Sequence, residues 1–138
     1  MTKEFWINLP VKNIHKSKKF FTKLGFKFNT QYSNSEDSAC LLLGDKNVVV
    51  MLFEEPSFKN FTKNQIADTG RGTEVLLSID AQNVEEVDEM VQKAIEAGGS
   101  KYCDPHDEGW LYGSGFTDLD GHRWNVLFMD MNEMPKQA

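Results

Sequence analysis

The sequence predicts an α+β fold in which two copies of a β-α-β-β-β unit form a curved, cup-shaped mixed sheet with helices on its outer face. Three observations support this prediction. Runs of alternating apolar and polar residues, typical of half-buried strands, recur along the chain. Two other segments carry apolar residues at helical spacing and end at glycine. The same order of elements occurs in residues 4–54 and again in residues 73–130.

The first copy opens with a strand over residues 5–9, which Pro10 closes. Asn13 is the expected N-cap of a helix, and Gly25 is expected at the C′ position that ends it. The apolar stripe of this helix comprises Ile14, Ser17, Phe20, Phe21 and Leu24. Further strands are predicted over residues 26–32, 39–43 and 48–53, with polar turns over 33–37 and 44–47 between them.

Residues 55–72 have no helical or strand period, contain Pro56, Phe58 and Phe61, and are predicted to be a connector. We expect this segment to join the two copies within a single domain spanning residues 1–138. The connector is either a lid or dimer contact, or a loop anchored by its two aromatic residues.

The second copy repeats the order with a strand over residues 74–79. Asn83 and Glu86 form an N-x-x-E capping box ahead of a second helical stripe that stops at the Gly98-Gly99 pair. That stripe comprises Val84, Val87, Met90, Val91, Ala94 and Ile95. A short strand over 101–103 and a turn-rich loop over 104–109 follow, and then strands over 110–118 and 122–129.

The last two strands meet at Asp120-Gly121, a dipeptide typical of a type I′ hairpin turn. Alternation places Trp124 and its neighbours at every second position on the helix side of the sheet, and Arg123 and Asn125 on the opposite side. The same reasoning, applied to all strands, predicts which side chains line the cup. They are Trp6, Asn8, Val49, Met51, Phe53, Glu74, Leu76, Ser78, Arg123, Asn125, Leu127 and Met129.

Composition and charge exclude several classes of function. The net charge of −6 argues against nucleic acid and anionic membrane surfaces as partners. No apolar run approaches the roughly 18–20 residues needed to span a bilayer, and the N-terminus lacks a signal-peptide core. A cytoplasmic protein is therefore expected. Cys40 and Cys103 have no CxxC spacing and are expected to be free thiols.

Several stretches resemble the vicinal oxygen chelate superfamily, which includes glyoxalase I, bleomycin-resistance proteins, fosfomycin-resistance proteins and extradiol dioxygenases. Residues 8–26 are similar to the opening strand, helix and Leu-Gly-Phe turn of these proteins. Residues 58–68, 107–113 and 116–124 resemble the branch described as predicted lactoylglutathione lyases. The resemblance implies the repeated fold, a small-molecule ligand and a homodimer.

Metal-dependent members place one ligand on the first and one on the fourth strand of each copy. The resemblance carries these places onto Trp6, Met51, Glu74 and Asn125. Trp6 has no ligating atom, Met51 offers a soft thioether, and Asn125 is a poor oxygen ligand. Glu74 alone is a competent ligand and base. We therefore predict no metal ligands and no cofactor, unless a lyase activity requires Ni, Zn, Mn or Mg.

The histidines do not supply a replacement metal site. His122 is expected to point to the helix side, and His15 lies among lysines on a helix. His106 belongs to an acidic loop, which is expected to be solvated.

The residues expected to bind ligand are Trp6, Asn8, Met51, Phe53, Trp110, Arg123 and Asn125. For Glu74 two interpretations stay open. It is either a structural carboxylate, paired with Arg123 or hydrogen-bonded near the mouth of the cup, or a buried acid with a raised pKa that acts as a general base or recognises a cationic ligand. Trp6, Met51, Phe53, Trp110 and Met129 either form a binding wall or fill the core.

The function predicted from these observations is binding of a small apolar or cationic molecule in a cup without a metal, as the resemblance to bleomycin-resistance proteins suggests. The alternative is a metal-dependent, lactoylglutathione lyase-like or dioxygenase-related enzyme with Glu74 as its catalytic residue. An unliganded scaffold is the third hypothesis.

Overall fold

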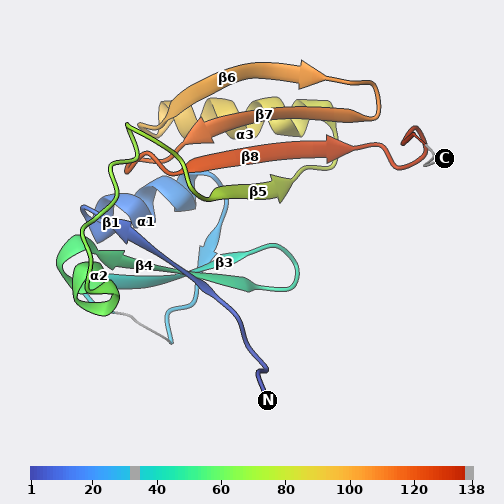
Figure 1. The fold of residues 1–138 in the computed structure, drawn as a ribbon. Helices are drawn as coiled ribbons and strands as arrows, with labels where there is room; N and C mark the ends of the chain where they lie inside the picture. Colours follow the sequence, from blue (N-terminus) through green and yellow to red (C-terminus); the bar gives the residue numbers. More distant parts are fainter. Residues whose placement is uncertain (32–34, 136–138) are drawn as a thin grey trace. The chain divides into compact units, whose positions relative to one another are not determined.

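The computed structural model describes residues 1–31 and 35–135. The chain divides into two compact units, 1–68 and 69–138. Each unit contains its own four-stranded mixed sheet, with strand order β1-β4-β3-β2 in the first and β5-β8-β7-β6 in the second (Figure 1). The duplicated α+β architecture is therefore confirmed, and it consists of two sheets with the same topology.

In the first unit, β1 (Ile7–Val11) pairs in parallel with β4 (Val48–Glu54), which pairs antiparallel with β3 (Ser38–Leu43). The short β2 (Lys27–Phe28) completes the sheet. Helix α1 (Ile14–Lys23) begins at Asn13, whose side chain accepts a hydrogen bond from the Lys16 amide, as the sequence predicts. Every residue of the predicted α1 stripe is buried.

In the second unit, β5 (Leu76–Asp80) pairs in parallel with β8 (Arg123–Met129). Strands β7 (Leu111–Thr117) and β6 (Ser100–Asp107) extend this sheet in antiparallel fashion. Helix α3 (Val84–Glu96) begins at Asn83, which caps the Glu86 amide. The Gln82 amide donates to the Glu86 carboxylate, whereas in a standard capping box the donor is the amide of the N-cap residue, here Asn83.

The connector contains a helix that the sequence analysis missed: α2 (Glu55–Thr62). Pro56 lies in the first turn of this helix, where proline is favoured because its missing N–H removes no helical hydrogen bond. None of the α2 residues is buried, so the helix has no apolar stripe that could reveal it. Its Phe61 ring contacts the Phe53 ring at a centroid distance of 5.0 Å.

Two prolines also led to wrong strand ends. Pro10 lies inside β1, and Pro105 lies inside β6, which was predicted as a short strand over 101–103 followed by a loop. Both are edge strands, where a missing N–H removes no ladder bond on the solvent side. Irregular register between Lys101 and His106 also accommodates Pro105.

Two strands are shorter than predicted. The strand expected over 26–32 ends at Phe28, because the Asn29 side chain accepts a bond from the Gln31 amide and turns the backbone away. Part of that prediction and of the adjoining turn, residues 32–34, lies outside the described residues. The strand expected from residue 74 begins at Leu76.

The hairpin between β7 and β8 forms, but not with a type I′ turn. Of its two central residues only Gly121 has a positive φ, 83°. The Gly121 amide donates to the Asp118 carbonyl, and the Asp118 amide donates to the His122 carbonyl. This pattern corresponds to a turn closed by one left-handed glycine.

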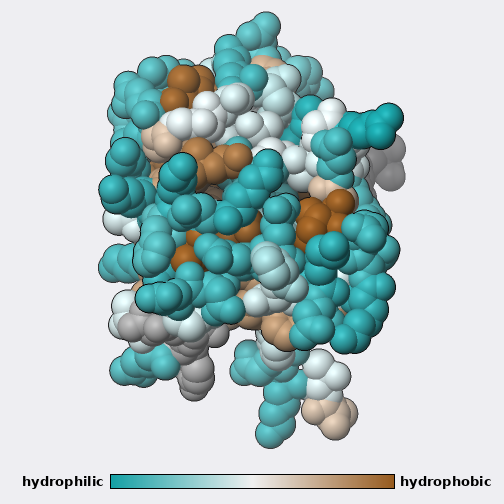
Figure 2. Space-filling view, turned by 90° about the vertical axis from the view of Figure 1, so that its left-hand side faces the viewer, coloured by the Kyte–Doolittle hydropathy of each residue, from teal (hydrophilic) through white to brown (hydrophobic). Residues whose placement is uncertain are grey.

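No helix among residues 1–31 and 35–135 is long and apolar enough to cross a bilayer. Hydrophilic side chains cover most of the face seen in Figure 2, and hydrophobic ones surface there only in small groups. Isolated exposed apolar residues of this kind are normal for a folded domain.

Candidate functional site

The second sheet separates apolar and polar side chains between its two faces. Trp124 and Val126 are fully buried on the side of α3, as predicted. From β7, Tyr112 reaches α3 on the same side and donates to Asp88 at 2.7 Å, which raises the pKa of Tyr112 to about 12. Arg123 and Asn125 alternate with the buried residues and therefore lie on the opposite face.

Arg123 is held by a residue that the sequence analysis did not select. Its guanidinium lies over the ring of Tyr102, 4.6 Å from the ring centroid, and its Nε is enclosed without a hydrogen-bond partner. Tyr102 occupies the space above Gly115, where any Cβ would collide with its ring. The sequence signal that could have revealed this contact is the pair of glycines in β7, Gly113 and Gly115, which leaves room for a large side chain from the neighbouring strand.

Asn125 lies directly opposite Ser78 across the parallel pair of β8 and β5. Its Nδ2 donates to the Ser78 hydroxyl over 3.4 Å, a long hydrogen bond. Arg123 pairs with Leu76, two residues earlier on β5. Arg123, Asn125 and Ser78 therefore form a polar row on this face, between the apolar side chains of Leu76 and Leu127.

Glu74 lies beyond the Arg123 end of this row, two residues before Leu76. It precedes β5, is exposed, and forms no ion pair with Arg123. Since Ser78 is the partner of Asn125, Glu74 lies four residues away in register, up to roughly 13 Å along the strand. The expected pairing with Arg123 and the expected buried carboxylate are both wrong, and the catalytic role of Glu74 remains a prediction.

The predicted site residues of the first unit lie in different environments. Trp6 precedes β1 and is 51% exposed, whereas Met51 is only 8% exposed. Asn8 is exposed and lies directly opposite Met51 in the β1–β4 pair. Phe53 packs against Phe61 of α2, so this helix covers part of the sheet face opposite α1.

Trp110, which belongs to the second unit, immediately precedes β7 and is half-buried, and its carbonyl accepts the Asp130 amide at 2.7 Å. A shallow groove of about 590 Å³ lies in the first unit along α2 and the segment after it. A smaller cavity of about 130 Å³ lies between α1 and the β2–β3 edge. Neither is lined by a predicted site residue.

The side chains at the four family metal positions do not fit a divalent ion. Trp6 offers no ligating atom, the Met51 thioether is soft, and the Asn125 amide oxygen is a weak neutral ligand. Among the described residues, no three His, Cys, Asp or Glu side chains gather closely enough to hold a metal. His106 bonds to Glu108 at 3.0 Å on the surface, and His15 is exposed.

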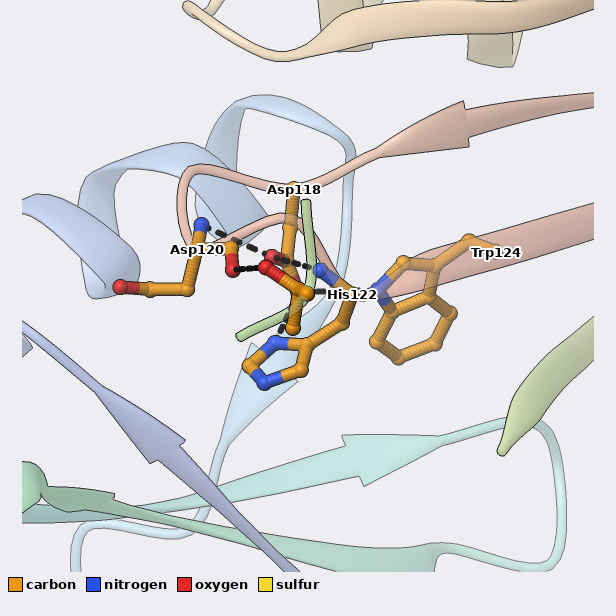
Figure 3. A network of polar contacts seen from close by, with 5 residues as sticks. Asp118, Asp120, His122 and Trp124 are labelled. Atoms are coloured by element: carbon orange, nitrogen blue, oxygen red, sulfur yellow. Dashed lines mark hydrogen bonds and ion pairs between the residues drawn. The ribbon is translucent and has the colours of Figure 1, made fainter. Parts of the chain in front are cut away.

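A buried polar network, which sequence reasoning missed, closes the β7–β8 hairpin (Figure 3). Asp118 Oδ2 accepts bonds from His122 Nδ1 at 2.9 Å and from Trp124 Nε1 at 3.0 Å. Asp118 Oδ1 accepts the backbone amides of Asp120 and His122. Thr69 donates to the Asp120 carbonyl at 2.7 Å and joins the start of this unit to the turn.

His122 is nearly enclosed, with 10% of its side chain exposed. Burial by itself would lower the pKa of His122, but the Asp118 hydrogen bond and the charges of Asp118 and Asp120 outweigh it, so the pKa is raised. Because both Asp118 oxygens serve the turn and the Trp124 indole, the network orders the hairpin that presents Arg123.

The model of the glyoxalase/bleomycin resistance protein/dioxygenase superfamily matches residues 5–126 of the chain. The solved structure of hypothetical protein SA1046 from S. aureus is 35% identical, with a TM-score of 0.81, and the match covers 92% of this chain and 94% of SA1046. A comparison with curated proteins gave no match.

More distant structures share the fold. A glyoxalase/bleomycin resistance protein/dioxygenase family enzyme from Burkholderia phytofirmans PsJN is 17% identical over 88% of this chain and 94% of its own, with a TM-score of 0.73. The fosfomycin resistance protein FosX from Listeria monocytogenes is 19% identical over 96% and 98%, respectively, with a TM-score of 0.66. At these identities the similarity concerns the fold alone.

Proposed function

The chain belongs to the glyoxalase/bleomycin resistance protein/dioxygenase superfamily, and on that premise we propose that it binds a small molecule without a metal ion. The proposed binding surface is the face of the second sheet opposite α3. The observation that carries the proposal is the row of Arg123, Asn125 and Ser78 between apolar neighbours. A few polar groups in an apolar frame are the usual composition of a ligand site.

The metal-dependent alternative has weaker support. A lactoylglutathione lyase-like reaction needs an ion to polarise the substrate oxygens and a carboxylate to move the proton. Glu74 is the one suitable side chain at the family positions, and it lies outside β5 and away from Asn125. The lyase branch, a homodimer and a cytoplasmic location remain predictions.

Metal binding and turnover separate the two functions. Untagged protein is dialysed against Ni²⁺, Zn²⁺, Mn²⁺ and Mg²⁺ and assayed with a hemithioacetal substrate, alongside Glu74→Gln. We expect no stoichiometric metal and no turnover by either protein. Stoichiometric metal together with turnover that Glu74→Gln abolishes would overturn the proposal in favour of the enzyme.

A further inference from the structure

The guanidinium of Arg123 has no hydrogen-bond acceptor and no counter-ion among the described residues. Its Nε is enclosed and has no hydrogen-bond acceptor, and its terminal nitrogens have no ion pair with any described carboxylate. The terminal nitrogens are not enclosed, so they are the atoms that a ligand oxygen can reach, and a charge-assisted hydrogen bond to them is stronger than a neutral one.

We propose that Arg123, held on the ring of Tyr102, receives an anionic oxygen group of the ligand, such as a carboxylate or a phosphate. This inference rests on the proposed function and names the chemistry of the ligand. It also replaces the apolar or cationic ligand that the sequence predicts with an anionic one, because the guanidinium is held in place without a counter-ion.

The orientation of the arginine is determined by packing. Gly115 leaves room for the Tyr102 ring to lie across the sheet, and the ring supports the guanidinium from one side. Burial raises the pKa of Tyr102, and this effect, with a contribution from Cys103, exceeds the opposing effect of Arg123. The phenol therefore stays neutral and does not itself compensate the positive charge of Arg123.

The charged groups around this face leave Arg123 available. Lys101 is paired with Asp104 at 2.9 Å and cannot take over the role of Arg123. Asp80 lies four residues along β5 from Leu76, the partner of Arg123, which is roughly 13 Å. Glu74 lies two residues before Leu76, roughly 7 Å along the strand, is exposed, and forms no ion pair with Arg123.

Ser78 defines a second contact point. It accepts the Asn125 amide and keeps its own hydroxyl proton for an acceptor on the ligand. The Ser78–Asn125 pair lies two residues beyond the Leu76–Arg123 pair, roughly 7 Å along the strands. The ligand class is therefore a small oxyanion that carries an apolar body and a second hydrogen-bonding group.

The test compares benzoate and phenyl phosphate with benzamide, a neutral analogue of benzoate. Binding is followed by NMR through the Arg123 Nε–H signal and the Tyr102 ring signals. We expect both anions to shift these signals and benzamide to bind at least 10-fold more weakly, since charge-assisted hydrogen bonds are roughly twice as strong as neutral ones. Arg123→Gln should weaken binding of the anions about 10- to 100-fold.

Two further variants separate the ring from the hydroxyl of Tyr102. Tyr102→Phe keeps the aromatic support and should bind the anions as the wild type does. Tyr102→Ala removes the ring and should weaken the binding of both anions. Benzamide binding as well as benzoate would overturn the anion inference but leave the proposed function standing. If none of the three probes shifts signals on this face, the anion inference and the proposed function both fail. A folded Arg123→Gln that binds benzoate unchanged overturns the inference alone.

Discussion

The two units have the same strand order, but their parallel strand pairs differ in register by two residues. In the first unit Asn8 faces Met51, so Trp6 lies two residues before the partner of Met51. In the second unit Ser78 faces Asn125, so Glu74 lies four residues before the partner of Asn125. Positions that the family resemblance treats as equivalent are therefore not equivalent in space.

The units also differ in how their hairpins are held. The turn between β3 and β4 is a short run of four residues with Asn47 at positive φ, and no side-chain hydrogen bond to its Asp45 is formed among the described residues. The turn between β7 and β8 is organised around the buried Asp118 carboxylate. Topology alone therefore does not determine which copy can present a precise polar site.

The largest effect should come from breaking the Asp118 network. Asp118→Ala leaves the Trp124 indole N–H and the turn amides without acceptors, and we expect a loss of about 3–5 kcal/mol in the free energy of unfolding. Asp45→Ala, in the corresponding turn of the first unit, should change it by less than about 0.5 kcal/mol. Urea denaturation measures both, and equal losses would show that the two hairpins do not differ as described.

The register difference can be tested by building metal sites. Trp6→His with Met51→His should bind Ni²⁺, whereas Glu74→His with Asn125→His should not, because four residues of offset is too far for a shared ion. Ser78→His with Asn125→His, directly opposite, is the positive control for the second unit. Ni²⁺ at a hundred times Kd should stabilise each binding variant by about 2.7 kcal/mol. Equal stabilisation of the Glu74 variant would contradict the register.

The contact between α2 and β4 belongs to the first unit only. Phe61→Ala removes the edge-on contact with Phe53 and should cost about 0.5–1.5 kcal/mol of stability, a small value because Phe61 is 62% exposed. Lys59→Ala, on the same helix, is the matched control and should be near neutral. Thermal unfolding monitored by circular dichroism distinguishes them, and no difference between the variants would mean that the aromatic contact is not stabilising.

The smallest expected effect is the pH dependence from His122, because burial opposes the stabilisation of its charged form. A pKa raised by folding stabilises the protein fully below the unfolded value of about 6.5, and this contribution disappears as pH rises through the folded pKa. The free energy of unfolding should therefore decrease over that window in the wild type and not in His122→Gln. An NMR titration of His122 that gives a pKa below about 6.5 would contradict the sign.

The sequence by itself determined the duplicated order, both helix caps, the buried stripe of α1, and the division of β8 into a buried and an open face. Of the predicted α3 stripe, Val87, Val91 and Ala94 are buried, whereas Ile95 is exposed. These features follow from local spacing, because helix and strand periods decide which side chains can share a face. Helix α2 is not predicted because it has no buried apolar stripe. The full length of β6 is not predicted because Pro105 favours a turn, and only the strand order shows that Pro105 lies on an edge strand.

Tertiary structure alone decided the features on which the candidate site depends. Register between β5 and β8 places Ser78 beside Asn125 and separates Glu74 from it. The contact of Tyr102 with Arg123 depends on the missing side chain of Gly115 on a neighbouring strand. Alternation along one strand predicts the face on which a side chain lies, but its neighbour across the sheet depends on strand pairing, which no single segment encodes.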